Sequence, residues 1–248
     1  MIESQIEIAS GDGRMTTFIT HPERGGPYPV ILFYMDAPGI REELRDMARR
    51  LASVGYCVML PNLYYRSGVM ELGPLPRDPN SPERKRMFAL MESLSIDKIM
   101  RDTDALLEYA KSMLAANVNS IGCVGYCMSG QYAINVAARY PDRVGAAASI
   151  YGVRLITHQS DSPHLATRKA KGELYFACAE IDHWMPLEQI EPLRTALRDA
   201  DANSEVEIFP RVEHGFAFPA RPAYDKPAAE RHWERLFALF GRRLDRPR

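Results

Sequence analysis

The sequence has few cysteines, no long apolar run and no excess of charge of either sign. Only 4 of the 248 residues are cysteines, and most lie in apolar segments, so we expect reduced thiols rather than a disulfide framework. A net charge of −1 supplies no basic field for nucleic acid or for an anionic membrane surface. No apolar run is long enough to span a bilayer. We therefore expect neither nucleic-acid nor membrane partners.

We expect no targeting signal at the beginning of the chain. Residues 1–5 contain neither a basic segment nor an apolar run, so we expect no signal peptide and a cytoplasmic location. Cys123 and Cys127 are four residues apart, but no second pair of metal ligands accompanies them, so no metal site is expected. The sequence shows no internal repeat, low-complexity tract or linker. With 46% apolar residues it suits one domain over residues 1–248.

The order of apolar patterns predicts an α/β fold. Residues 2–9 alternate between apolar and polar side chains, and residues 15–20 read as the return strand of an antiparallel hairpin. Buried strands are then predicted at 30–35, 57–60, 121–124, 144–151, 173–179 and 205–209, and helices near 44–51, 96–115, 128–139, 187–200 and 229–240. Alternating strands and helices predict a mainly parallel central sheet with helices on both faces.

Residues 62–82 are rich in proline, glycine and arginine. Long loops of this kind often carry function, so we expect this one to contribute to a binding site. Pro82 suits the first turn of a further helix.

A strand, a tight turn and a helix surround Cys127. The strand at 121–124 runs into Gly125-Tyr126-Cys127-Met128-Ser129, which resembles the nucleophile elbow of α/β-hydrolases. The residues two before and two after the nucleophile must be small, and Gly125 and Ser129 are. A cysteine thiol ionises more readily at a helix N-terminus and beside an imidazole. We therefore interpret Cys127 as a nucleophile, although a buried structural cysteine in a turn is a common alternative.

Two downstream residues complete a candidate triad in the order nucleophile, acid, histidine. Asp182 follows the strand at 173–179, and His214 follows the strand at 205–209. His214 would act as the general base, and Asp182 would orient its imidazole. Glu180 competes with Asp182 for the acid role. His183 competes with His214, but it shares a loop with Asp182 and would orient poorly.

The remaining polar candidates are weaker. His158 and His164 are interpreted as surface or pocket-rim residues, and His21 and His232 as surface residues. An oxyanion hole needs two backbone N–H groups, one from the residue after the nucleophile and one from the loop after the third strand. Met128 is the first candidate. Ala37 is the second, because Pro38 has no N–H to donate.

With these motifs in place, the sequence resembles the dienelactone hydrolase (carboxymethylenebutenolidase) family of the α/β-hydrolase superfamily. The most specific stretches are 60–64, 122–130, 181–186 and 214–216. The resemblance implies a cofactor-free hydrolase of small esters or lactones with a Cys-Asp-His triad, which maps onto Cys127, Asp182 and His214.

The resemblance also implies a latch and a carboxylate clamp. Members of this family carry a glutamate that pairs with the resting cysteine; here the position is Asp36, which is one methylene shorter. Its namesake members hold a substrate carboxylate with two arginines. One falls near Arg84, with Arg86 as a rival, and the other falls at Phe218, which cannot pair with a carboxylate. Pocket walls are expected from Tyr64, Phe88, Tyr151 and Trp184, with ordinary packing as the alternative for each of them.

Three functions are compatible with these residues. The leading hypothesis is an ester or lactone hydrolase that forms a thioester acyl-enzyme at Cys127. A thioesterase or peptidase could use the same triad, although the chain lacks an insertion large enough to serve as a propeller or lid for a large peptide. The third is a non-enzymatic thiol sensor or binding protein. The quaternary state is expected to be a monomer or a homodimer.

Overall fold

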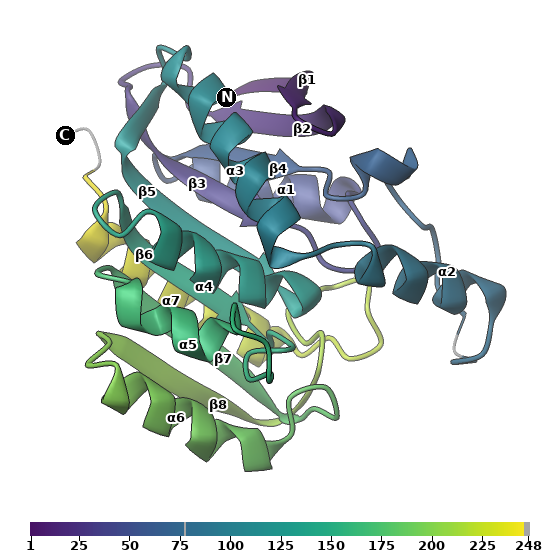
Figure 1. The fold of residues 1–248 in the computed structure, drawn as a ribbon. Coiled ribbons are helices and arrows are strands. Elements are labelled where there is room, and N and C mark those ends of the chain that lie inside the picture. Colours follow the sequence, from purple (N-terminus) through teal and green to yellow (C-terminus); the bar gives the residue numbers. More distant parts are fainter. Residues whose placement is uncertain (77, 246–248) are drawn as a thin grey trace.

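The computed structural model describes residues 1–76 and 78–245, and Arg77 and residues 246–248 lie outside it. It contains one sheet of eight strands (Figure 1). The strands are β1 (Ile2–Ser10), β2 (Gly13–His21), β3 (Tyr28–Tyr34), β4 (Cys57–Pro61), β5 (Ala116–Tyr126), β6 (Val144–Ile150), β7 (Glu173–Ile181) and β8 (Ser204–Glu213). Their order in the sheet is β1-β2-β4-β3-β5-β6-β7-β8. Strands β3 to β8 are mutually parallel, and β1 and β2 form the antiparallel hairpin.

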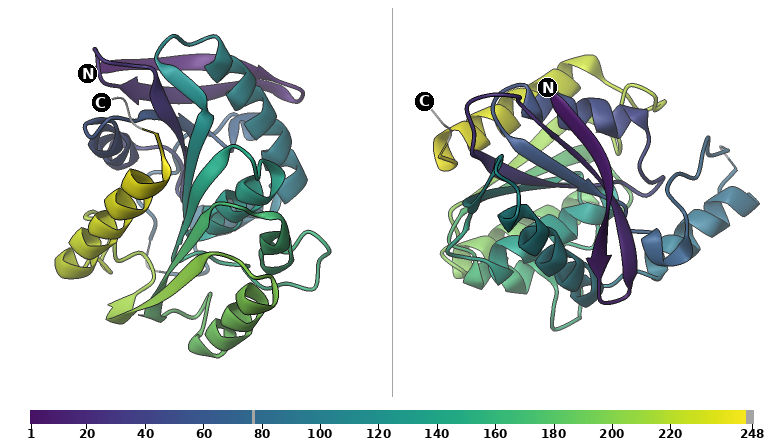
Figure 2. Two further views of the ribbon diagram at one scale, coloured as in Figure 1. Left: turned by 90° about the vertical axis from the view of Figure 1, so that its left-hand side faces the viewer. Right: turned by 90° about the horizontal axis from the view of Figure 1, so that it is seen from above.

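Helices cover both faces of this sheet. They are α1 (Glu42–Ala52), α2 (Pro82–Glu92), α3 (Ile96–Lys111), α4 (Gly130–Arg139), α5 (Pro163–Ala166), α6 (Ile190–Asp199) and α7 (Lys226–Arg243). Figure 2 shows α1 and α7 on one face and α3, α4 and α6 on the other. This arrangement confirms the predicted α/β-hydrolase fold. None of the helices within the described ranges is long and apolar enough to cross a membrane.

Some strands extend beyond their apolar cores. β5 begins at Ala116 rather than near 121, because the polar residues of its first half still pair with the start of β3. β8 continues to Glu213 through Pro210. A proline, which has no N–H, is tolerated there because β8 lies at the edge of the sheet. The N–H groups on the outer side of an edge strand have no neighbouring strand to pair with. Both differences arise from strand pairing rather than from local hydrophobicity.

His232 corrects one sequence-based interpretation, since it was expected at the surface. It lies on the inner face of α7 and is 0% exposed. Its ring pairs with the Tyr126 hydroxyl at 3.1 Å and with the Ala229 carbonyl. Burial lowers the pKa of His232 to about 4, so the imidazole is neutral at physiological pH. The apolar face of α7 is therefore wider than its hydrophobic residues alone indicated.

The parallel strands place five loops at one edge of the sheet. Asp36 follows β3, Cys127 follows β5, Tyr151 follows β6, Asp182 follows β7, and His214 follows β8. α2 lies at this same edge and extends away from the sheet (Figure 1). The carboxyl edge is where ligands bind in open α/β sheets.

Candidate active site

Cys127 occupies the sharp turn between β5 and α4. Its φ angle is 54°, a left-handed conformation that is strained for a residue with a side chain. Gly125 makes the turn possible, because a Cβ at this position would lie 2.1 Å from the Ser129 carbonyl oxygen. The Ser129 hydroxyl donates to the Met35 carbonyl oxygen at 2.5 Å and so ties the turn to the end of β3. A serine at this position therefore joins two loops of the site, which a glycine could not do.

Asp182 and His214 are directly hydrogen-bonded. The His214 Nδ1 lies 2.7 Å from Asp182 Oδ2. The other oxygen, Oδ1, accepts from the backbone N–H groups of Trp184 at 2.9 Å and Met185 at 3.3 Å. Glu180 is engaged elsewhere, since it accepts from the Arg211 N–H. The geometry thus places Asp182, not Glu180, against the imidazole.

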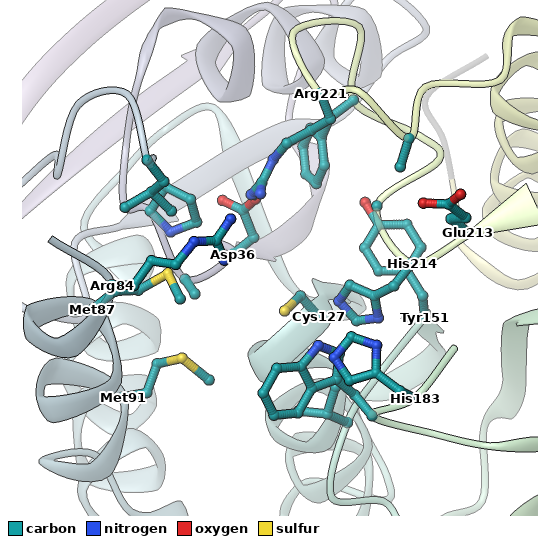
Figure 3. A pocket seen from close by; sticks show the side chains of 18 of the residues that line it. Asp36, Arg84, Met87, Met91, Cys127, Tyr151, His183, Glu213, His214 and Arg221 are labelled. Atoms are coloured by element: carbon teal, nitrogen blue, oxygen red, sulfur yellow. The ribbon is translucent and has the colours of Figure 1, made fainter. Parts of the chain in front are cut away.

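His214 offers its second ring nitrogen to the cysteine. Nε2 is buried and has no hydrogen-bond partner in the described part of the chain, and the ring faces Cys127 (Figure 3). Burial disfavours the charged imidazole. The interactions of His214 with Cys127 and with Asp182 outweigh burial and raise the pKa of the imidazole to about 10. The arrangement favours a protonated imidazole that faces the Cys127 sulfur.

A titration of His214 tests this coupling. In the wild-type protein the imidazole is expected to lose its proton near pH 10. In Cys127→Ala the titration should move to lower pH, because the interactions with Cys127 that raise the pKa of His214 are gone. Because the folded-state pKa is the higher one, stability from this proton is full below about 6.5 and is lost as the pH rises through about 10. NMR of the imidazole carbons measures the midpoint, and an unchanged midpoint would contradict the coupling.

A pocket of about 510 Å³ opens over Cys127 and His214. In Figure 3 the charged groups of Asp36, Arg84 and Arg221 lie on one side of the pocket, the charged side, and Met87 and Met91 lie beside Arg84. The lining also contains apolar residues (Leu75, Phe88 and Trp184) and further charged residues (Glu92, Arg154 and Glu213). The lining suits a small molecule with one polar and one apolar end.

Asp36 lies between two arginines. Its carboxylate is fully buried and accepts from Arg41 Nη1 at 2.6 Å and from Arg221 Nη2 at 2.6 Å. Arg41 also pairs with Glu43 at 2.7 Å, so the group contains two charges of each sign. Among the described residues, Asp36 bonds to these arginines rather than to Cys127. The expected thiol latch is therefore absent from this structure, because the shorter side chain is held by two guanidinium groups.

Most of the predicted pocket residues line this pocket. Arg84 does so, whereas Arg86 is exposed and lies outside the lining. Phe88 and Trp184 form one wall, with ring centroids 5.7 Å apart. Tyr151 and Phe218 lie on the floor, both with buried side chains.

The position of Tyr64 corrects a prediction from the sequence, because the residue lies behind the pocket and not in its wall. Its hydroxyl is buried and donates to the Ala37 carbonyl oxygen at 2.9 Å, and it also contacts the Met128 sulfur at 3.2 Å. Both oxyanion-hole candidates therefore contact Tyr64. Ala37 lines the pocket next to Asp36. Met128 stands in the first turn after the cysteine, where backbone N–H groups lack partners within the helix.

Arg41 and Arg221 were missed by sequence reasoning. Both guanidinium groups lie over the Phe218 ring, at 4.9 and 5.8 Å from its centroid. Arg221 lies in the loop between β8 and α7 and reaches back to Asp36, which is 185 residues away in the chain. The only available signal was an arginine a few residues after His214. Its use depends on how that loop folds.

The other histidines take no place beside the nucleophile. His183 lines the pocket, but it is exposed and packs on Trp184 with ring centroids 4.6 Å apart. His158 is exposed and His164 is half-buried; neither belongs to the described lining of this pocket. His21 is half-buried and pairs with the carbonyl of its neighbour, Pro22. His214 is thus the imidazole that the structure brings to Cys127.

Comparisons with known proteins agree with this arrangement. Residues 15–244 match the model of the dienelactone hydrolase family. A Methylorubrum extorquens protein named "Putative carboxymethylenebutenolidase" is 27% identical over 95% of this chain and 79% of its own length. An Escherichia coli K12 protein of the same name is 28% identical over 94% of this chain and 84% of its own.

Solved structures show the same fold. A crystal structure titled "Putative Dienelactone Hydrolase" from Klebsiella pneumoniae gives a TM-score of 0.86 at 24% identity, covering 97% of this chain and 98% of that one. The dienelactone hydrolase of Anabaena variabilis gives a TM-score of 0.65 at 17% identity, with 98% and 99% covered. The chain therefore belongs to the dienelactone hydrolase family and is a carboxymethylenebutenolidase-like hydrolase.

Proposed function

We propose that the protein hydrolyses small esters or lactones through a Cys127–His214–Asp182 triad and a thioester acyl-enzyme. One observation carries the proposal. His214 bonds Asp182 through Nδ1 at 2.7 Å and turns its unpartnered Nε2 toward a cysteine held in a strained elbow. This is the geometry that a nucleophile, a proton carrier and an orienting carboxylate require.

The residues divide the reaction between them. The Cys127 thiol passes its proton to His214 and its sulfur attacks the carbonyl carbon, while the N–H groups of Ala37 and Met128 hold the oxyanion. The carbon–oxygen bond of the ester then breaks, and His214 gives its proton to the departing oxygen. In the second half-reaction His214 takes a proton from water, whose oxygen attacks the thioester and breaks the carbon–sulfur bond. Asp182 holds the ring and stabilises its charged form throughout.

The lining of the pocket supports a substrate class. The Arg221 side chain is 33% exposed, and only its Nη2 donates to Asp36, so other N–H groups of the guanidinium can donate to a ligand. Arg84 stands on the same charged side, while Met87 and Met91 form a wall that adapts to apolar groups. We infer that the preferred acyl group carries a negative charge at one end and an apolar arm.

The acyl-enzyme is directly observable. When the protein is mixed with an aryl acetate and quenched within one turnover, mass spectrometry should find one acetyl group on the peptide that contains Cys127. Iodoacetamide should label the same residue first, because Cys57, Cys123 and Cys178 are buried. Acetylation of a serine or of no residue, with steady ester turnover, would refute the thioester. Fast alkylation without any ester turnover would favour a thiol sensor.

Arg221→Gln tests the charged side of the pocket. We expect it to lower kcat/KM about 10-fold or more on a lactone that bears a free carboxylate, because a charge-assisted hydrogen bond contributes about 1.5–3 kcal/mol. The methyl ester of the same lactone should lose little.

Arg86→Gln is the matched control. It removes an arginine that is exposed and outside the pocket lining, so both lactones should react at nearly wild-type rates. Equal losses on both lactones in Arg221→Gln would mean that Arg221 supports the loop rather than the substrate.

A further inference from the structure

The floor of the pocket holds a phenol that makes no hydrogen bond. Tyr151 follows β6 and lines the pocket, and its side chain is 1% exposed. Its hydroxyl oxygen is buried and has no hydrogen-bond partner within residues 1–76 and 78–245. An unpaired buried hydroxyl destabilises a fold, and a phenylalanine would avoid that cost. A tyrosine here needs a reason outside the stability of the protein.

The backbone and the ring of Tyr151 are held in place by neighbouring residues. Tyr151 has a φ of 36°, in the left-handed region, and its N–H donates to the Ala177 carbonyl oxygen at 2.7 Å. The ring packs edge-on against His214, with centroids 5.0 Å apart, and against Phe216 at 5.2 Å. Strained backbone that the surroundings enforce is concentrated at functional sites.

The direction of the hydroxyl relates it to the charged side of the pocket. In Figure 3 it points away from the His214 ring, toward the side on which Asp36 and Arg221 lie. Burial, followed by the interactions with Tyr126 and Asp36, raises the pKa of Tyr151 well above its ordinary value. The phenol therefore keeps its proton and is available as a neutral hydrogen-bond donor.

We propose that Tyr151 donates a hydrogen bond to an oxygen in the acyl chain of the substrate, beyond the carbonyl that Cys127 attacks. The acceptor is an oxo group or a carboxylate oxygen. This proposal rests on the proposed ester or lactone hydrolysis and adds a selectivity that Arg221 cannot supply, since a guanidinium favours charged acceptors. The protein should select acyl chains with an oxygen at this position over chains of the same length without one.

Two aryl esters of equal chain length test the proposal. The 4-nitrophenyl esters of 4-oxopentanoate and of pentanoate differ in one oxo group. After subtraction of the uncatalysed rates, Tyr151→Phe should lower kcat/KM about 10-fold on the oxo ester and less than about 2-fold on the pentanoate. The decrease in kcat/KM should arise mainly from a higher KM, because the Tyr151 phenol does not touch the reacting carbonyl.

Tyr34→Phe is the matched control. The Tyr34 hydroxyl is buried and bonded to the Thr103 hydroxyl at 2.7 Å, and the residue lies outside the pocket lining. This variant should leave the ratio of the two esters unchanged and should lower Tm, because it loses a satisfied hydrogen bond. Tyr151→Phe should leave Tm unchanged or raise it.

A binding measurement separates this proposal from the proposed function. The N-methyl amides of the two acids are used to protect Cys127 from iodoacetamide, which requires no turnover. The oxo amide should protect at lower concentration in the wild type, and the difference should vanish in Tyr151→Phe. Equal effects of Tyr151→Phe on both acyl chains, or none on either, would overturn the role of the phenol. If the wild-type protein hydrolyses no ester but shows the expected protection pattern, the proposed hydrolysis is refuted and the role of Tyr151 in binding stands.

Discussion

Replacement of Cys127 with alanine is expected to abolish ester hydrolysis, lowering kcat/KM by at least about 10³-fold. Without the sulfur no thioester forms, and water has no activated route to the carbonyl. The oxyanion N–H groups and the pocket remain, so a small residual rate above that of water should persist. Steady-state kinetics with an aryl acetate measures the loss.

Cys178→Ala is the control for this substitution. Cys178 is another free cysteine, buried in β7 and outside the pocket lining. Its loss should lower stability modestly, because it leaves a small cavity in the core, while ester hydrolysis stays near the wild-type rate. If Cys127→Ala keeps full activity, the nucleophile has been misassigned, whatever the Asp182–His214 geometry.

The main features of the fold could be predicted because they are local. Alternating residues defined the hairpin, and short apolar runs ended by turn residues defined the parallel strands. Since strand ends in a parallel sheet share one edge, chain order alone brought Cys127, Asp182 and His214 together. The pairing of Asp182 with His214 at 2.7 Å agrees with that expectation.

The polar contacts around Asp36 could not be predicted in the same way. Arg221 and Asp36 are 185 residues apart, and their contact depends on the path of the loop after β8. Phe218 at one of the two clamp positions predicted that this arginine is missing. No pattern in the sequence indicates that Arg41 and Arg221 lie over the Phe218 ring. Tertiary contacts between loops leave no periodic pattern in the sequence.

Tyr64 and His232 show the same limit for buried side chains. The sequence predicts Tyr64 as a pocket wall because it is an aromatic residue in a loop. In the structure its hydroxyl donates to the Ala37 carbonyl oxygen instead. A histidine among charged residues was read as exposed, but it pairs with Tyr126 inside the fold. Burial of a polar side chain depends on a partner that is distant in sequence.

The second large effect is expected for Asp182→Asn, with a loss in kcat of about 10⁴-fold. The asparagine Oδ1 can still accept from the N–H groups of Trp184 and Met185, which fixes the orientation of the amide. Its NH₂ group then faces His214 Nδ1 as a donor. Nδ1 must become an acceptor, so the ring proton moves to Nε2 and points at Cys127. The imidazole can no longer accept a proton on that side.

Glu180→Gln separates this effect from a general loss of charge in the loop. Glu180 lies two residues before Asp182, and its carboxylate accepts from the Arg211 N–H instead of from the imidazole. An amide oxygen can accept the same bond, so kcat should change by only a few fold. Asp182→Asn also removes a hydrogen bond that raises the pKa of His214, so the midpoint of its titration should fall below about 10. A slow Asp182→Asn enzyme with an unshifted His214 titration would show that Asp182 acts on something other than the imidazole.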